Sequence, residues 1–239
     1  MRLSAKGLVK RFGKRVVVKN VDFAARQSEV VGLLGPNGAG KTTMFSLIVG
    51  LLKPEAGQIY LNEKDITALP MYKRTRLGLG YLPQEPSIFR KMTVEENLRA
   101  ILEMRNLPQE RQEELAAELL LEFNLENVRG QKGYQLSGGE RRRTEIARAL
   151  CLEPAFLFLD EPFAGIDPIA VAEIQEIVAG LRRRNLGIII TDHNVRETLR
   201  ITDRAYILHL GEVLVAGPTE DVARDELAKK YYLGTNFSL

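Results

Sequence analysis

Apolar residues occur along this chain in short runs that alternate with amphipathic segments. Residues 1–34 contain three strand-like runs, RLSAKGLVKRF, KRVVVKNVDF and SEVVGLLG, and the last is apolar at nearly every position. AFLFLD at 155–160 and LGIIIT at 186–191 repeat this continuous pattern, whereas TTMFSLIVGLL at 42–52 is helical in character. Continuously apolar strands separated by helices are typical of a parallel sheet covered on both faces. We therefore expect an α/β fold, with GQIYLNEKDI at 57–66 as a further strand.

The middle of the chain has a different, helical pattern. After a proline-containing stretch at 82–91, the segment TVEENLRAILEMR begins with Thr93 and Glu96 at the spacing of a capping box. EELAAELLLEFNL then places apolar residues four apart on one helix face. We therefore predict a helical lobe inserted into an α/β core. The predicted units are the core at 1–85 and 151–220, the lobe at 86–150, and a tail at 221–239.

Composition and charge limit the partners and the cellular compartment that we expect for this chain. The 34 basic and 31 acidic residues leave a net charge of +3 without a long block of one sign, which argues against nucleic-acid binding. The runs RRR at 141–143 and 182–184 are expected on solvated helix faces. The single cysteine, Cys151, excludes an internal disulfide and is expected to be a buried thiol in a reducing compartment. Because no stretch approaches ~18 consecutive apolar residues, we expect a soluble chain that reaches a membrane only through a partner.

GPNGAGKT at 35–42 matches the phosphate-loop pattern G-x-x-x-x-G-K-[ST] and lies between a buried strand and a helix, as that loop requires. The loop's N–H groups would point at phosphate oxygens, and the amine of Lys41 would add a positive charge at the β- and γ-phosphates. The hydroxyl of Thr42 would bind Mg²⁺. Thr43 follows at the helix N-terminus, where the dipole favours an anion. The predicted phosphate cradle comprises Gly35, Pro36, Asn37, Gly38, Ala39, Gly40, Lys41, Thr42 and Thr43.

Polar residues follow two other buried strands at the edge where open α/β sheets bind ligands. Asp160 would join the magnesium shell, and Glu161, one residue later, would polarise a water for attack on the γ-phosphate. A solvated loop pair is the alternative for these two carboxylates. His193 follows the strand at 186–191, where either a hydrogen bond to the γ-phosphate or a purely structural role fits its position.

A second glycine-rich turn, LSGGERRR at 136–143, begins a helix. Ser137 and Glu140 have the spacing of a capping box, and the apolar stripe that follows is expected to be buried with the arginines facing outward. Two glycines in the first helical positions weaken a helix by about 1 kcal/mol each relative to alanine, so capping alone does not explain Gly138 and Gly139. Because the first loop already cradles one ATP, we expect this bare helix N-terminus to face the γ-phosphate held by a second copy.

These elements, in this order, resemble the nucleotide-binding subunits of ABC transporters over nearly the full chain. LSGGE is similar to the family's signature motif, and Gln84 in YLPQE matches the Q-loop glutamine, which reaches Mg²⁺ and the attacking water. AGID at 164–167 resembles the D-loop, and His193 matches the switch histidine. Phe12 occupies the place of the adenine-stacking aromatic, often a tyrosine, so the hydroxyl is missing but the stacking face is retained.

The resemblance implies a P-loop NTPase (RecA-like) parallel-sheet core with an N-terminal antiparallel β subdomain and an inserted α-helical subdomain. It also implies Mg²⁺-dependent ATP hydrolysis by a head-to-tail homodimer that sandwiches two ATP molecules. Catalysis would fall to Glu161, His193 and Gln84, metal binding to Thr42, Gln84 and Asp160, and further nucleotide contacts to Phe12, Ser137, Gly138, Gly139, Glu140 and Asp167.

Within the family, the resemblance is dense to the ATPases that power lipopolysaccharide export, in segments such as GLGYLPQEPSIFRKMTVEENL, DEPFAGIDPIAV and YLGTNF. It implies a peripheral protein on the cytoplasmic face of the inner membrane, bound to two integral membrane subunits of the LptF/LptG type. Neither lipid nor nucleic acid would touch the ATPase directly. Phe89 and Arg90 are the candidates for contact with the membrane subunits, and packing of Phe89 in the helical lobe is the alternative.

Other functions fit fewer of these residues. The ATPase of a branched-chain amino-acid importer has a similar core and is the alternative within transport. ABC ATPases of DNA repair or ribosomes usually carry coiled-coil insertions or two nucleotide-binding cores, and a metabolic kinase would leave LSGGE, Gln84 and His193 unexplained. In the tail, Tyr231, Tyr232 and Phe237 either pack on the chain's own core or contact a second copy.

Overall fold

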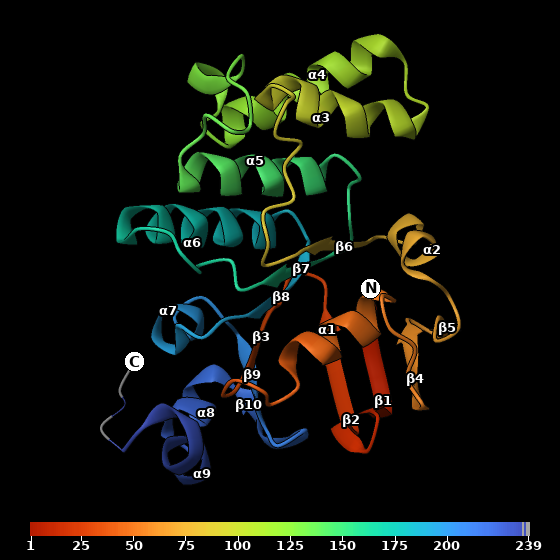
Figure 1. Ribbon diagram of the computed structural model, residues 1–239, viewed down its shortest axis with the longest axis vertical. Helices are drawn as coiled ribbons and strands as arrows, with labels where there is room; N and C mark the ends of the chain where they lie inside the picture. Colours follow the sequence, from red (N-terminus) through yellow and green to blue (C-terminus); the bar gives the residue numbers. More distant parts are fainter. Residues whose placement is uncertain (236, 238–239) are drawn as a thin grey trace.

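A six-stranded sheet runs through the middle of the computed structural model, which describes residues 1–235 and 237 (Figure 1). Its neighbouring strands pair in parallel, except for the antiparallel pair β9–β10. Every residue of β3, β7 and β8 is buried, as the apolar runs predicted. In spatial order the strands are β10 (Glu212–Pro218), β9 (Arg204–His209), β3 (Val30–Leu34), β8 (Gly187–Thr191), β7 (Phe156–Asp160) and β6 (Leu79–Leu82).

A four-stranded antiparallel sheet forms the N-terminal part of the fold, in agreement with the expected β subdomain. Its order is β2 (Arg15–Arg26), β1 (Arg2–Phe12), β4 (Ala56–Leu61) and β5 (Lys64–Asp65). The prediction of a single strand at 57–66 is wrong, because the chain turns at Asn62, whose φ is 54°. Tyr60 then pairs with Asp65 across a tight hairpin.

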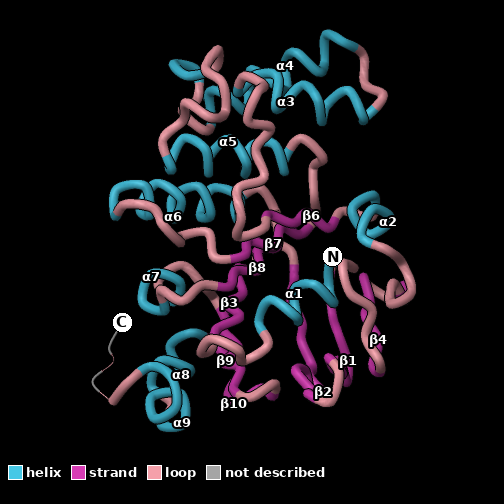
Figure 2. Tube along the Cα trace, viewed as in Figure 1, coloured by secondary structure: helices cyan, strands magenta, loops and turns pink. Residues whose placement is uncertain are grey.

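Helices cover both faces of the six-stranded sheet, with α5 and α6 on one side and α1 on the other (Figure 2). The predicted capping box is present at Thr93, which begins α3. The α-helices are α1 (Lys41–Val49), α2 (Met71–Arg76), α3 (Val94–Leu102), α4 (Gln109–Glu122), α5 (Gly138–Leu150), α6 (Pro168–Arg183), α7 (Val195–Leu199), α8 (Thr219–Arg224) and α9 (Glu226–Ala228). Shorter turns are the 3₁₀ helices η1 (Glu103–Arg105) and η2 (Glu126–Val128) and the π-helical η3 (Lys229–Leu233).

Alternate residues of the central strands belong to two hydrophobic cores. In β7, Leu157 and Leu159 join a cluster with α3, α4, α5 and α6, whereas Phe156 and Phe158 join a cluster with α1 and the antiparallel sheet. The first cluster is continuous from the sheet to α4, at the far end of the molecule (Figure 1). The helices of 94–150 therefore share a core with one face of the sheet rather than having a separate one.

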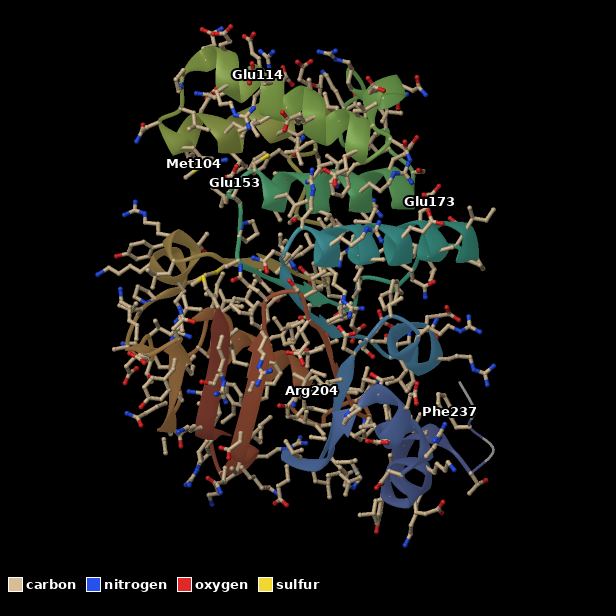
Figure 3. The ribbon with its side chains drawn as sticks, turned by 180° about the vertical axis from the view of Figure 1, so that it is seen from behind. Met104, Glu114, Glu153, Glu173, Arg204 and Phe237 are labelled. Atoms are coloured by element: carbon tan, nitrogen blue, oxygen red, sulfur yellow. The ribbon has the colours of Figure 1, made fainter. Side chains whose placement is uncertain are left out.

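Two of the three arginines at 141–143 do not face solvent as predicted. Arg142 is only 6% exposed, because its guanidinium donates to the backbone oxygens of Pro83 and Asp160 and pairs with the buried carboxylate of Glu145. Arg143 pairs with Glu173, which lies between α5 and α6 in Figure 3. Specific polar partners, which the local pattern does not reveal, account for this burial.

The C-terminal residues pack mainly on their own chain. Tyr232 and Phe237 contact a small cluster that includes Leu34 and Ile207, whereas Tyr231 is 45% exposed and lies beside His209. Residues 236, 238 and 239 of the predicted tail lie outside the described residues, and the division into core, lobe and tail stays a prediction. Within residues 1–235 and 237, no helix has the length and apolar character needed to cross a membrane.

Candidate functional site

The phosphate-loop residues connect β3 to α1 and line a cleft of about 280 Å³. Two glycines are required by the backbone itself. Gly35 has a φ of 145°, and a Cβ atom there would lie 2.2 Å from the carbonyl oxygen of Leu208. Gly40 has a φ of 107°, and its Cβ would lie 2.8 Å from the carbonyl oxygen of Val17. The loop is therefore folded tightly against β9 and β2, which a residue with a side chain would prevent.

The cleft brings together residues from three distant parts of the sequence. Phe12 ends β1, Glu161 follows β7, and the remaining predicted residues of the lining come from the phosphate loop and α1. Sequence reasoning missed Arg15, which pairs with Phe12 across the β1–β2 ladder and also lines the cleft. The lining residues are Phe12, Arg15, Val17, Asn37, Gly38, Gly40, Lys41, Thr42, Thr43 and Glu161; Pro36 and the buried Ala39 belong to the same loop.

Lys41 is only 6% exposed, and its ammonium group donates to the carbonyl oxygens of Gly35, at 2.7 Å, and Pro36, at 3.2 Å. Burial lowers the pKa of Lys41, and the nearby carboxylates of Glu161 and Asp160 oppose that shift. The loop thus places a positive charge next to the two acidic residues predicted from the sequence.

The three predicted catalytic residues meet at one carboxylate oxygen. Gln84 donates its amide N–H to Glu161 Oε2 at 2.8 Å, and His193 Nδ1 lies 3.4 Å from the same oxygen. The backbone of Glu161 has a φ of 46°, an uncommon conformation for a residue with a side chain. Its N–H donates to the carbonyl oxygen of Thr191 at 2.8 Å, which fixes the turn after β7. The His193 side chain is 61% exposed, so solvent reaches the side of Glu161 that His193 contacts.

The carboxylate of Asp160 is buried beneath this group, with a residue exposure of 2%. Its Oδ1 accepts a hydrogen bond from the Thr191 hydroxyl at 2.5 Å, and its Oδ2 accepts one from the Tyr81 hydroxyl at 3.2 Å. Neither partner was identified from the sequence. The strand register was the available signal, because β6 and β8 pair on either side of β7.

The LSGGE turn begins α5 with both hydrogen bonds of a capping box. The Glu140 carboxylate accepts from the Ser137 backbone N–H at 2.8 Å, and the Ser137 hydroxyl accepts from the Glu140 N–H at 3.3 Å. These interactions with Ser137 lower the pKa of Glu140. In the described part of the chain, residues 136–140 are not among those that line the phosphate-loop cleft.

The predicted D-loop lies beside this turn. Asp167 caps α6, because its Oδ1 accepts from the N–H groups of Ile169 and Ala170, both at 3.0 Å. A Cβ atom on Gly138 would lie 3.6 Å from Ile166 Cγ2. The signature turn and the D-loop therefore form one surface, separate from the cleft.

Two oppositely charged, buried side chains of α5 contact each other and also bind the backbone of the Q-loop. Besides its bonds to Pro83 and Asp160, Arg142 lies 3.3 Å from the Glu145 carboxylate, which in turn accepts from the backbone N–H of Ser87 at 2.6 Å. Phe89, two residues later, is 41% exposed, and its ring lies 4.6 Å from the guanidinium carbon of Arg148. Arg90 is also exposed. Both predicted partner-contact residues are thus accessible at the surface.

The oxygen atoms near the cleft match the preference of Mg²⁺ for hard ligands: the Thr42 hydroxyl, the Asp160 carboxylate and the Gln84 amide. Across residues 1–235 and 237, no group of three or more histidine, cysteine or acidic side chains is arranged to hold a metal by itself. This donor set suits an ion that nucleotide phosphates also coordinate.

Comparison with known proteins agrees with this geometry. Residues 18–164 match the family model described as ABC transporter. The lipopolysaccharide export system ATP-binding protein LptB of Acidithiobacillus ferridurans is 54% identical, and the alignment covers 99% of this chain and 98% of that protein. A solved ATP-binding cassette of an ABC transporter in its ADP conformation is 28% identical, with a TM-score of 0.87 and coverage of 98% and 99%. A cassette solved as a dimer in a post-hydrolysis state with ADP and Pi is 26% identical, with a TM-score of 0.80 and coverage of 91% and 98%.

Proposed function

This chain belongs to the ABC transporter family of ATP-binding proteins, and on that premise we propose that it is the ATP-hydrolysing subunit of a lipopolysaccharide exporter. The observation that carries the proposal is the convergence of Gln84 and His193 on one oxygen of Glu161, beside the phosphate-loop cleft. A carboxylate contacted by an amide and an imidazole can polarise a water for attack on the γ-phosphate, as hydrolysis requires.

In the proposed reaction, the backbone of the phosphate loop and Lys41 hold the β- and γ-phosphates, and Phe12 stacks on the adenine. Thr42, Asp160 and Gln84 would hold Mg²⁺, which neutralises developing charge when bound. Glu161 accepts a proton from the attacking water, and His193 contacts the γ-phosphate. Asp160 and Glu161 thus have different tasks, because the first is buried between strands and the second faces the cleft.

We further propose that the working unit is a head-to-tail homodimer. The signature turn does not line its own chain's cleft, so Ser137, Gly138, Gly139 and Glu140 would meet the ATP held by the second copy, with Asp167 beside them. The γ-phosphate then bridges two subunits, and its hydrolysis releases the bridge. The solved cassette that is dimeric with ADP and Pi supports the pairing of two copies.

The Q-loop would transmit the movement of the dimer to the membrane subunits. Arg142 and Glu145 tie the segment between Pro83 and Ser87 to α5, so that movement of the signature helix also moves Phe89 and its neighbour Arg90. Membrane subunits of the LptF/LptG type would receive this movement at the cytoplasmic face of the inner membrane. The name of the 54% identical relative supports lipopolysaccharide as the cargo, and isolating the assembled complex and identifying its membrane subunits tests this against an amino-acid importer.

The replacement Glu161→Gln tests the proposed reaction and the clamp together. It keeps the side chain's size but removes the base, so we expect ATP hydrolysis to fall by at least about 100-fold, in keeping with the contribution of a general base. The variant should accumulate as an ATP-bound dimer, measured by size-exclusion chromatography with light scattering.

The matched control is Lys41→Ala, which should stay monomeric with ATP because the phosphate site is lost. A Glu161→Gln protein that stays monomeric at saturating ATP would contradict the clamp. Hydrolysis by that variant at the wild-type rate would instead contradict the role of Glu161 as the base.

A further inference from the structure

The Asp160 carboxylate is held from both sides by hydroxyl groups of the neighbouring strands. Thr191 on β8 pairs with Asp160 on β7 in the ladder and donates to Oδ1 at 2.5 Å. Tyr81 on β6 donates to Oδ2 at 3.2 Å. Each oxygen therefore receives one hydrogen bond, Oδ1 from β8 and Oδ2 from β6, and the carboxylate cannot rotate without breaking both.

This arrangement leaves acceptor capacity on each oxygen. An ionised carboxylate has about four lone-pair sites, and the two hydroxyls occupy two of them. Asp160 is 2% exposed, so bulk water does not compensate a carboxylate that turns away. Because both hydroxyl groups hold the carboxylate in place, its remaining lone pairs keep a fixed direction.

Tyr81 lies on β6, immediately before the Q-loop. It pairs with Phe158 in the β6–β7 ladder, and Gln84 follows only three residues later. The Tyr81 hydroxyl is the donor of the hydrogen bond to Asp160 Oδ2. A phenylalanine would fill the same space between strands but would leave Oδ2 without that donor.

We propose that Tyr81, together with Thr191, is a positioning residue that orients the Asp160 carboxylate toward the Mg²⁺ of bound MgATP. The inference rests on the proposed function, because it assigns a residue that supports the same metal site. Groups that orient a metal ligand typically change metal affinity by about 10- to 100-fold when removed.

The test compares nucleotide affinity with and without metal in the full-length protein. A fluorescent, non-hydrolysable ATP analogue is titrated in excess Mg²⁺ and again in excess EDTA, so that the ratio of the two dissociation constants measures the contribution of the metal. For Tyr81→Phe we expect this ratio to fall by about tenfold. The affinity in EDTA and the unfolding temperature should match the wild-type values.

Two controls separate positioning from packing. Tyr72→Phe removes the hydroxyl of a 59% exposed tyrosine and should leave the ratio unchanged. At the second hydroxyl, Thr191→Val should lower the ratio, whereas Thr191→Ser keeps the donor and should restore it.

A ratio for Tyr81→Phe within twofold of the wild-type ratio overturns the inference, as does an equal loss of affinity in EDTA, which would indicate a packing defect. If the wild-type protein itself gains no affinity from Mg²⁺, the proposed metal use fails and the inference fails with it.

Discussion

At Gly139, a Cβ atom would lie 3.1 Å from the Cβ of Ala170 on α6, whereas at Gly138 the nearest such contact would be Ile166 Cγ2 at 3.6 Å. Gly139 therefore has a packing reason to lack a side chain, because α5 and α6 approach closely there. Gly138 has room for a methyl group within its own chain. Of the two glycines, it is the one whose bare surface is explained by a second molecule rather than by packing.

This difference predicts that two alanine substitutions affect stability differently. Gly138→Ala should raise the free energy of unfolding by up to about 1 kcal/mol, from helix propensity. It should also lower ATP hydrolysis by roughly tenfold, or about 1.4 kcal/mol, because the methyl group faces the partner's nucleotide. Gly139→Ala should be less stable than Gly138→Ala, since the same gain is offset by crowding against Ala170. Urea unfolding and steady-state hydrolysis measure the two quantities.

The two variants control for each other, because they add the same atom at adjacent positions. Wild-type hydrolysis by Gly138→Ala would mean that the signature turn acts only as a helix start.

Local residue patterns indicated where the candidate site lies. The phosphate loop, Asp160 and Glu161 were assigned from short segments, because glycines and polar residues at strand ends show where a sheet binds phosphate. The position of His193 left its role open, and only the family resemblance assigned it. The burial of Arg142 was not predicted. Its partners, the backbone oxygens of Pro83 and Asp160, are 59 and 18 residues away, so no pattern within a single helix reports them.

The position of α1 depends on one buried arginine from α2. Arg74 is 1% exposed, and its guanidinium donates to the carbonyl oxygens of Leu47 and Ile48 at the end of α1, at 2.8 and 2.6 Å. It also donates to Leu69 and Thr67 in the preceding loop, at 2.8 and 2.9 Å. Burial lowers the pKa of Arg74 to about 10, so the group remains charged at neutral pH.

We predict that Arg74→Lys lowers the free energy of unfolding by about 2–4 kcal/mol, because an ammonium group cannot reach all four carbonyl oxygens and buried acceptors are left unpaired. Arg76→Lys, on the exposed face of the same helix, should change it by less than about 0.5 kcal/mol. Denaturant unfolding at pH 7 provides both values. Equal stabilities of the two variants would show that the carbonyl groups find other partners.

The elements themselves were predictable where apolar periodicity was strong. The strands at 30–34, 156–160 and 187–191 and the helix after Thr93 agree with the structure. The hairpin at 57–66 was missed, because an alternating pattern continues through Asn62 although the backbone reverses there. Strand order and the pairing of β6 with β7 are long-range features that no single segment reports.

At the scale of the whole molecule, the signature turn and the phosphate-loop cleft lie on separate surfaces of one chain. If each active site takes one part from each copy, two inactive variants should complement one another. We predict that mixing Ser137→Arg with Lys41→Ala, each inactive alone, restores activity. Each mixed dimer contains one intact site of two, so the rate should reach at most about half of the wild-type rate.

The mixture is measured by steady-state hydrolysis after co-incubation with ATP, at a fixed total protein concentration. A mixture of Lys41→Ala with Glu161→Gln serves as the control and should stay inactive, because both residues line the same cleft. In that mixture each site carries either a lost lysine or a lost base. Full activity of the Ser137→Arg variant alone would contradict shared sites.

The continuous core between the sheet and α4 limits how cassettes of this kind can be recombined. Val171, Ile174 and Val178 of α6 pack in the same cluster as the leucines of α3, α4 and α5. A graft that replaces only residues 86–150 with those of a relative would therefore cut through one hydrophobic core and combine residues from both parents in it. Exchanging α6 together with those helices keeps interacting residues from the same parent. For the same reason, we expect substitutions in α6 among relatives to accompany substitutions in residues 86–150.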